Sequence, residues 1–201
     1  MMKILLLLGR RAKMPKEEVI WIETLTGKRV NPLNIREEDI CIEDIARPLS
    51  RLCRYVGQCS RFYSVGQHCI HVADLVHSEF RDDDSVMLTN TTCLAALLHD
   101  GAEAYTNDIS RPVKYAIKGI KEMEDRLTGV VMKKFDCIGV DWKLIHKADD
   151  ILLATEAYQM MKSKGEGWYL PEPRMTATLP TMSEEEVYNT FMERYYRFGG
   201  K

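Results

Sequence analysis

The sequence predicts an all-α fold, a helical bundle with a small β-hairpin near the N-terminus. Apolar residues recur at helical spacing in several long stretches, and the β-prone residues gather around Thr26-Gly27. No internal repeat or linker divides the chain. We therefore expect one domain over 1–201, with a hairpin region at 1–40, a helical core at 41–162 and a C-terminal extension at 163–201.

Composition indicates a globular protein that does not coat nucleic acid. The 201 residues are 45% hydrophobic, enough for one core, and the formal net charge is only −2. The six cysteines form no C-x-x-C pair and stand mostly among apolar residues, as thiols of a reducing compartment do. We expect a cytoplasmic protein with no nucleic-acid partner.

The N-terminal apolar run at 4–8 has five residues. A secretory signal needs about 7–15 apolar residues and a membrane span about 20, so neither is expected. The run is either a short strand or precedes the true start at Met14.

The hairpin lies within 20–33, and the helices follow it. Spacing predicts a first helix over 43–55, in which Pro48 marks either a kink or the start. Ser64 and Gln67 form a capping box that opens the second helix. The later helices are predicted at 91–105, 114–135 (weakened by Gly119 and Gly129), 142–161 and, after an irregular 165–180, from the Ser183–Glu186 capping box onward.

Three of these helices carry metal-ligand residue types among apolar residues. His68 shares a face with Val72, His99-Asp100 interrupts an apolar stretch, and Asp149 shares a face with Leu152, whereas Asp150 lies on the other side. A carboxylate on an apolar face needs a cation, because burying it unpaired costs several kcal/mol. Two histidines and two aspartates can hold a divalent metal, such as Mn²⁺, Co²⁺, Zn²⁺ or Mg²⁺.

The alternative for each residue alone is structural. A lone histidine on an apolar face is more often a hydrogen-bonded core residue, and a His-Asp dipeptide arises by chance. The order His, His-Asp, Asp on separate helices favours the metal site. His71, His77 and His146 are interpreted as structural.

Four stretches resemble the HD-domain phosphohydrolases, and the resemblance spans about 20–160. They are FYSVGQH at 62–68, AALLHDGAEAYTNDI at 95–109, RPVK at 111–114 and KAD at 147–149. They look most like bacterial 5′-deoxynucleotidases and phage dATP triphosphohydrolases. The blocks TGKRVNP at 26–32 and IEDIA at 42–46 resemble the phage-type branch.

The resemblance implies an HD-domain bundle and a role for each matched residue. The metal ligands are His68, His99, Asp100 and Asp149. Glu103 is the carboxylate beside the metal water, and Asp108 is a second acidic residue that orients the nucleophile or leaving group. Arg54 and Tyr55 match an Arg-aromatic pair that binds substrate, with a poorer fit in spacing. Asn107 replaces the family's glycine, which leaves the shape of that loop open.

Spacing supports Glu103, which lies four residues after His99 and three after Asp100 and can reach the metal site. The alternative is an exposed helix glutamate. Arg111 and Lys114 can neutralise phosphate. Arg51 and Arg61 extend this basic wall if they face it, and Lys118 is interpreted as surface.

The expected function is metal-dependent cleavage of the 5′-phosphate ester of 2′-deoxynucleotides, with a preference for a dNTP such as dATP. The alternatives are a 5′-deoxynucleotidase on dNMPs, a non-catalytic nucleotide-binding regulator, and an enzyme for a cyclic nucleotide or an alarmone. The resemblance also implies a homo-oligomer, for which Val187, Phe191 and Tyr195 form a candidate contact face.

Overall fold

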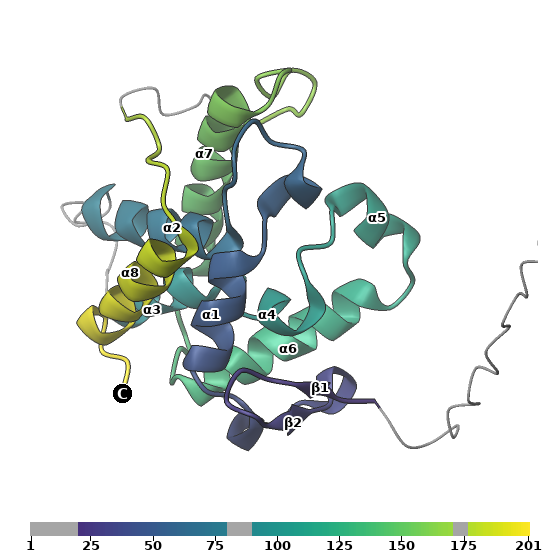
Figure 1. Cartoon of the computed structure of the whole chain (residues 1–201). Helices are drawn as coiled ribbons and strands as arrows, with labels where there is room; N and C mark the ends of the chain where they lie inside the picture. The colour runs from purple at the N-terminus through teal and green to yellow at the C-terminus, as the bar shows by residue number, and fades with distance from the viewer. Residues whose placement is uncertain (1–19, 80–89, 171–176) are drawn as a thin grey trace, which may run out of the picture.

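Helices dominate the computed structural model, and two short antiparallel strands lie beside them, as the sequence predicts (Figure 1). The structure describes residues 20–79, 90–170 and 177–201. The elements are β1 (Ile22–Glu23), β2 (Arg29–Val30), η1 (Pro32–Asn34), η2 (Glu37–Asp39), α1 (Glu43–Arg51), η3 (Arg54–Gly57), α2 (Val65–Glu79), α3 (Asn90–Leu98), α4 (Glu103–Thr106), α5 (Arg111–Ala116), α6 (Ile120–Lys134), α7 (Trp142–Met160) and α8 (Glu184–Arg197). Among these helices, none has the length and apolar character needed to cross a membrane.

The predicted hairpin is present and is fastened to α1. Ile22 pairs with Val30 across β1 and β2, and Gly27 takes a φ of +80°, which only glycine adopts without strain. The backbone N–H and hydroxyl of Thr26 donate to the Asp44 carboxylate at 2.8 and 2.6 Å. The Asp44 carboxylate, in the first turn of α1, thus accepts the hydrogen bonds that the hairpin turn donates.

Helix α2 lies in the centre of the bundle and packs against α1, α3, α7 and α8 (Figure 1). Ser64 caps it by accepting from the Gln67 N–H at 3.1 Å, so that half of the predicted capping box is present. This position buries His68 completely. A side chain at this point can meet groups from several other helices.

The predicted first helix is shorter than expected. It contains Pro48 and ends at Arg51, because Leu52 takes an extended ψ of 116°. In η3, Tyr55 and Val56 then adopt left-handed φ values of 59° and 54°. Such values are costly for a β-branched or bulky residue, so tertiary contacts must hold this segment.

The predicted helix at 91–105 is wrong in one respect: it breaks after Leu98 and resumes as α4. Gly101 donates to the Leu98 carbonyl at 2.8 Å, and a Cβ at Gly101 would lie 2.9 Å from that oxygen. Only glycine fits this close approach. His99 and Asp100 therefore project from a tight turn rather than from a helix.

The predicted helix at 114–135 is also divided. Gly119 adopts a φ of +84° and separates α5 from α6, while Gly129 stays within α6. The left-handed residue turns the chain sharply and lets α5 stand apart from α6 (Figure 1).

The C-terminal helix α8 belongs to the core of the chain. Its Ser183–Glu186 capping box is present as predicted, and α8 packs on α1, α2 and α3. Val187, Phe191 and Tyr195 are buried in that contact. The prediction that these three residues form an oligomer contact face is therefore wrong, since the chain's own core already covers them.

Helix α7 matches its predicted range to within one residue, and the described part of 165–180 lacks helices and strands, as predicted. All six cysteines are free thiols. The apolar run at 4–8, the alternative start Met14 and residues 171–176 of the irregular segment lie outside the described residues.

Candidate metal centre and adjoining cavity

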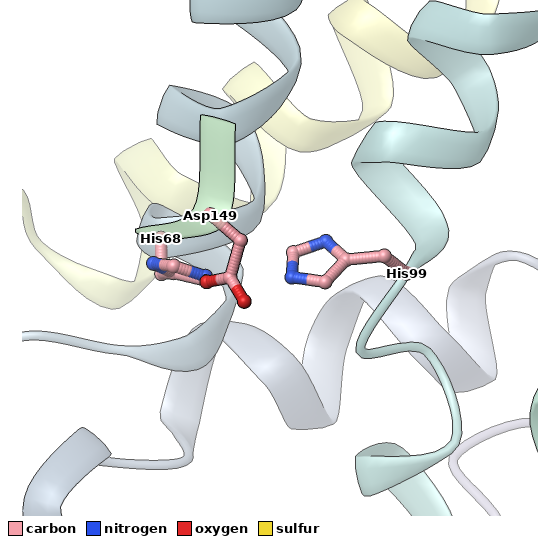
Figure 2. Close-up of side chains that lie close together, drawn as sticks. All are labelled: His68, His99 and Asp149. Carbon is pink, nitrogen blue, oxygen red and sulfur yellow. The ribbon is translucent and has the colours of Figure 1, made fainter. Parts of the chain in front are cut away.

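Helix α2, the turn after α3 and helix α7 bring the four predicted metal ligands together. Figure 2 shows His99 facing His68 and Asp149 across a short gap, and ligand atoms of these three residues lie within 4.8 Å of one another. Nε2 of His68 lies 3.0 Å from Asp149 Oδ1 and 3.9 Å from Asp100 Oδ2. Nε2 of His99 lies 3.4 Å from the same Asp100 oxygen.

Glu156 determines which nitrogen of His68 faces this cluster. Burial by itself would raise the pKa of Glu156, but the charges of Arg54 and His68 outweigh it and lower the pKa to about 2. The ionised carboxylate can only accept, so His68 Nδ1 donates to it at 2.6 Å. Nε2 therefore points at the cluster.

Protonation of this imidazole is governed by the same neighbours. Burial and the charge of Arg54 would lower the pKa of His68, but Glu156 and Asp149 outweigh them and raise it to about 10. A metal ion bound at Nε2 would take the place of this second proton.

The backbone orients His99 in the same sense. The carbonyl of Ala96 accepts from His99 Nδ1 at 2.7 Å, so Nδ1 carries the proton and Nε2 carries a lone pair. Nε2 of His68 and Nε2 of His99 are both buried and make no hydrogen bond of good geometry within the described chain, although Asp149 Oδ1 lies 3.0 Å from the first and Asp100 Oδ2 lies 3.4 Å from the second. Two imidazole nitrogens that face two carboxylates fit a divalent metal ion, because that set offers the nitrogen and oxygen ligands such ions take.

Cys69, His99 and Asp100 form a second group with metal-ligand spacing. A cysteine binds metal as the thiolate, and burial raises the pKa of Cys69 well above its usual value. The histidine and aspartate set is therefore the better candidate. Cys69 packs beside it as a neutral thiol.

The sequence reasoning missed Glu156, which is fully buried on α7. Its carboxylate accepts from Tyr55 OH at 2.6 Å, Tyr63 OH at 2.9 Å and Arg54 Nε at 3.2 Å, besides His68. A signal was available: Glu156 lies seven residues after Asp149, two helical turns along the same face. A second carboxylate on that face is the orienting partner that metal-binding histidines usually have.

A cavity of about 610 Å³ opens beside the cluster and is lined by all four predicted substrate-binding residues and both predicted catalytic residues. The predicted residues that line it are Arg54, Tyr55, Asp100, Glu103, Asp108, Arg111, Lys114 and Asp149. The lining residues that were not predicted are Val56, Ile109, Ser110, Pro112, Leu153, Met161, Trp168 and Leu170. The volume suits a ligand of nucleotide size.

Glu103 is buried in the wall of this cavity and is not an exposed helix glutamate. Its Oε1 lies 3.5 Å from Lys114 Nζ, and its Oε2 has no hydrogen-bond partner in the described residues. Burial and the charges of Asp100 and Asp108 raise the pKa of Glu103 well above its usual range. A carboxylate so placed can exchange a proton with a group inside the cavity.

The turn before Asp108 has a backbone conformation that favours glycine, the residue that the resemblance places there. Asn107 adopts a φ of 67° with a ψ of 162°, a combination that is essentially restricted to glycine, so the surrounding structure must enforce it. Asp108 reaches the cavity wall.

The basic side chains divide into two groups. Arg54, Arg111 and Lys114 line the cavity; Arg54 pairs with Glu156 and Asp100, and Lys114 with Glu103 and Glu124. Arg51 instead lies 3.4 Å from Glu184, and Arg61 donates to Thr181 and the Leu179 carbonyl. These two arginines are not part of the cavity lining, and Lys118 is exposed as predicted.

The other three described histidines have structural contacts, in agreement with their interpretation. His71 stacks on Tyr63, His77 packs on Phe198, and His146 packs on Trp142. None belongs to a described group with metal-ligand spacing.

Comparison with known proteins gives relatives without a described activity. No protein-family model matches the chain. It is 34% identical over 179 residues to the uncharacterized protein YfdR of Escherichia coli K12, an alignment that covers 87% of this chain and 93% of YfdR. It is 35% identical over 147 residues to the uncharacterized protein RCAP_rcc00048 of Rhodobacter capsulatus, covering 70% and 72%. The chain therefore belongs to the family that includes YfdR and RCAP_rcc00048.

Proposed function

We propose that the protein is a metal-dependent phosphohydrolase that cleaves the 5′-phosphate ester of 2′-deoxynucleotides. The observation that carries the proposal is the convergence of two buried imidazole nitrogens, His68 Nε2 and His99 Nε2, on the carboxylates of Asp100 and Asp149 at the wall of a cavity. Neither nitrogen makes a hydrogen bond of good geometry to the described residues, and a divalent ion bound between them and the carboxylates would satisfy all four groups.

A divalent ion bound there supplies Lewis-acid activation of water and of the phosphoryl group. His68, His99, Asp100 and Asp149 would hold the ion. Glu103 Oε2, which is buried and has no hydrogen-bond partner among the described residues, would take a proton from the attacking water.

The remaining charged residues of the cavity orient the ester. Arg111 and Lys114 bind the phosphate oxygens from the first turns of α5, where both line the cavity. The acidic side chain of Asp108 orients the nucleophile or the leaving group. Water's oxygen then bonds to phosphorus as the P–O ester bond breaks, and the leaving oxygen takes a proton.

The cations that line the cavity bear on the number of phosphates in the proposed substrate. A dNTP, such as dATP, is the first candidate from the resemblance. Arg51 and Arg61 do not extend the basic wall, however, and two of the three cavity cations already pair with carboxylates. This observation favours the second candidate, hydrolysis of a dNMP to nucleoside and phosphate.

The experiment is a turnover assay of purified, EDTA-treated protein reloaded with Mn²⁺, Co²⁺, Zn²⁺ or Mg²⁺. Each dNMP and dNTP is tested beside its ribonucleotide, and nucleoside, phosphate and triphosphate are separated. Release of phosphate from dNMPs or of triphosphate from dNTPs supports the proposal and separates its two forms. Nucleotide binding without turnover under every metal would instead indicate a non-catalytic regulator.

The homo-oligomeric assembly and the cytoplasmic location of the protein stay predictions. We expect a homo-oligomer whose contact surface does not include the buried face of α8. Light scattering that gives a monomer at high protein concentration would contradict it.

A further inference from the structure

An aromatic pair lines the cavity beside the charged cluster. The rings of Tyr55 and Trp168 lie 6.1 Å apart between centroids, at an interplanar angle of 44°. Tyr55 cannot rotate freely, because its hydroxyl donates to Glu156 at 2.6 Å. Trp168 keeps 37% of its surface exposed, and both residues belong to the cavity lining. Part of the indole of Trp168 is thus left uncovered by the described residues.

Apolar residues share the lining of the cavity with this pair. Val56, Leu153, Met161 and Leu170 line the cavity together with it. Leu153 follows Asp149 by one turn of α7, so the apolar lining begins directly beside the metal ligands. A cavity lined both by charged groups and by an aromatic and apolar surface fits a ligand with an anionic group joined to a flat, apolar one.

The backbone on both sides of the pair is held in unusual conformations. Tyr55 and Val56 have left-handed φ values, as do Lys164 and Tyr169 in the segment that carries Trp168. Gly165 and Gly167 supply two more left-handed positions there. Strain of about 1–3 kcal/mol at each non-glycine position persists only where the surroundings enforce it, and it gathers at ligand-binding sites.

We propose that Trp168 is a base-stacking residue: its indole, beside the ring of Tyr55, holds the nucleobase while the charged cluster holds the phosphate. The inference rests on the proposed function, because it takes the ligand to be a nucleotide. It goes further by assigning the base end of the cavity to the segment at 161–170. Stacking reads the flat face of the base, so every base has some affinity for this subsite.

The test compares two hydrolysis-resistant ligands on Mn²⁺-loaded protein. One is the methylene phosphonate analogue of dAMP, and the other is the same phosphonate of deoxyribose without a base. Calorimetric titration measures both affinities in the wild type, Trp168→Ala and Trp168→Phe. Tyr169→Ala is the matched control, because Tyr169 is the next residue, is fully exposed and does not line the cavity.

Trp168→Ala should weaken binding of the nucleotide analogue by about 5- to 150-fold, the range for loss of one stacking partner of a base. Binding of the base-less phosphonate should stay unchanged, Trp168→Phe should recover much of the loss, and Tyr169→Ala should behave as wild type. The wild type should also show a change in tryptophan fluorescence with the nucleotide analogue that Trp168→Phe lacks.

Equal losses for both ligands in Trp168→Ala would overturn the inference, since Trp168 would then only shape the cavity. No loss for either ligand, or no binding of the nucleotide analogue to wild type, would overturn it as well. Failure of the proposed function looks different: the stacking results hold, yet natural nucleotides are bound and never cleaved.

Discussion

Two buried carboxylates, those of Glu156 and Glu103, border the candidate metal centre, and the protein satisfies their hydrogen-bonding capacity to opposite extents. Glu156 on α7 accepts from four protein donors, and its pKa is lowered to about 2 by Arg54 and His68 despite burial. Glu103 in α4 has one lysine at 3.5 Å and an oxygen with no partner in the described residues, and burial leads the causes that raise its pKa.

This difference distinguishes a carboxylate that holds its neighbours in place from one that is a candidate for proton transfer. A carboxylate whose hydrogen bonds are all made within the protein is rigid and orients its neighbours. A buried carboxylate with an unmet oxygen costs stability and is retained where a ligand or a reaction needs it. Glu156 thus holds His68 and Tyr55 in place, and Glu103 is available to the contents of the cavity.

Removing a metal ligand should have the largest effect. We expect Asp149→Ala to lose both bound metal and turnover, because Asp149 Oδ1 lies 3.0 Å from His68 Nε2 in the cluster. Metal content by mass spectrometry is measured beside the rate. The control is Asp150→Ala, which removes the neighbouring carboxylate on the exposed side of α7 and should change neither quantity.

Glu103→Ala should separate binding from reaction. The metal should stay bound, because Glu103 is not one of the four ligands, but turnover should fall by about 10²–10⁴-fold, as for a lost general acid or base. The exposed Glu122→Ala on α6 serves as control. A variant with normal metal content and near-normal turnover on every nucleotide would refute this role and make Asp108 the next candidate.

Glu156→Gln should lower the affinity of the protein for the metal ion. An amide keeps the volume but weakens the contact with His68 Nδ1, and loss of such an orienting partner costs about 10- to 100-fold in metal affinity. Titration with Mn²⁺ measures the dissociation constant. Tyr63→Phe removes a single donor to Glu156 and should cost less. An unchanged dissociation constant in Glu156→Gln would show that the carboxylate only stabilises the fold.

Asp44 extends the comparison to a satisfied carboxylate that does not line the cavity, and its replacement should have the smallest effect. Burial would raise the pKa of Asp44, but hydrogen bonds from Cys41 and Thr26 outweigh it and lower the pKa. Its contribution to stability is therefore complete above its unfolded pKa of about 3.9 and is lost as the pH falls through the lower folded value.

Asp44→Asn should accordingly reduce the free energy of unfolding by about 1–3 kcal/mol at pH 7, the usual value of hydrogen bonds to a charged group. Urea titrations between pH 7 and pH 2.5 measure the difference, which should shrink in acid as the wild-type carboxylate is protonated. A difference that grows in acid would contradict the assignment. Turnover should be unaffected.

The features of the fold that the local sequence pattern encodes could be predicted from the sequence alone. Hairpin, capping residues and the inward face of α7 follow from turn residues, side-chain hydrogen bonds within four residues, and helical spacing. His68, His99, Asp100 and Asp149 were found for the same reason, since a polar group inside an apolar stripe is visible in the chain itself.

Other features depend on contacts between distant segments. The predicted helix breaks into a turn at Gly101, where a Cβ would approach Leu98 O too closely for any other residue, and nothing within the local spacing indicates that break. Glu156 gains its role from Tyr55, Tyr63 and Arg54, which are about a hundred residues away in sequence. The face of α8 would be apolar both in a contact with the core of its own chain and in a contact with another chain. Only the packing of the folded chain distinguishes these two possibilities. Local spacing specifies which side of a helix is apolar, and the partner that covers that side is specified by the sum of all packing contacts.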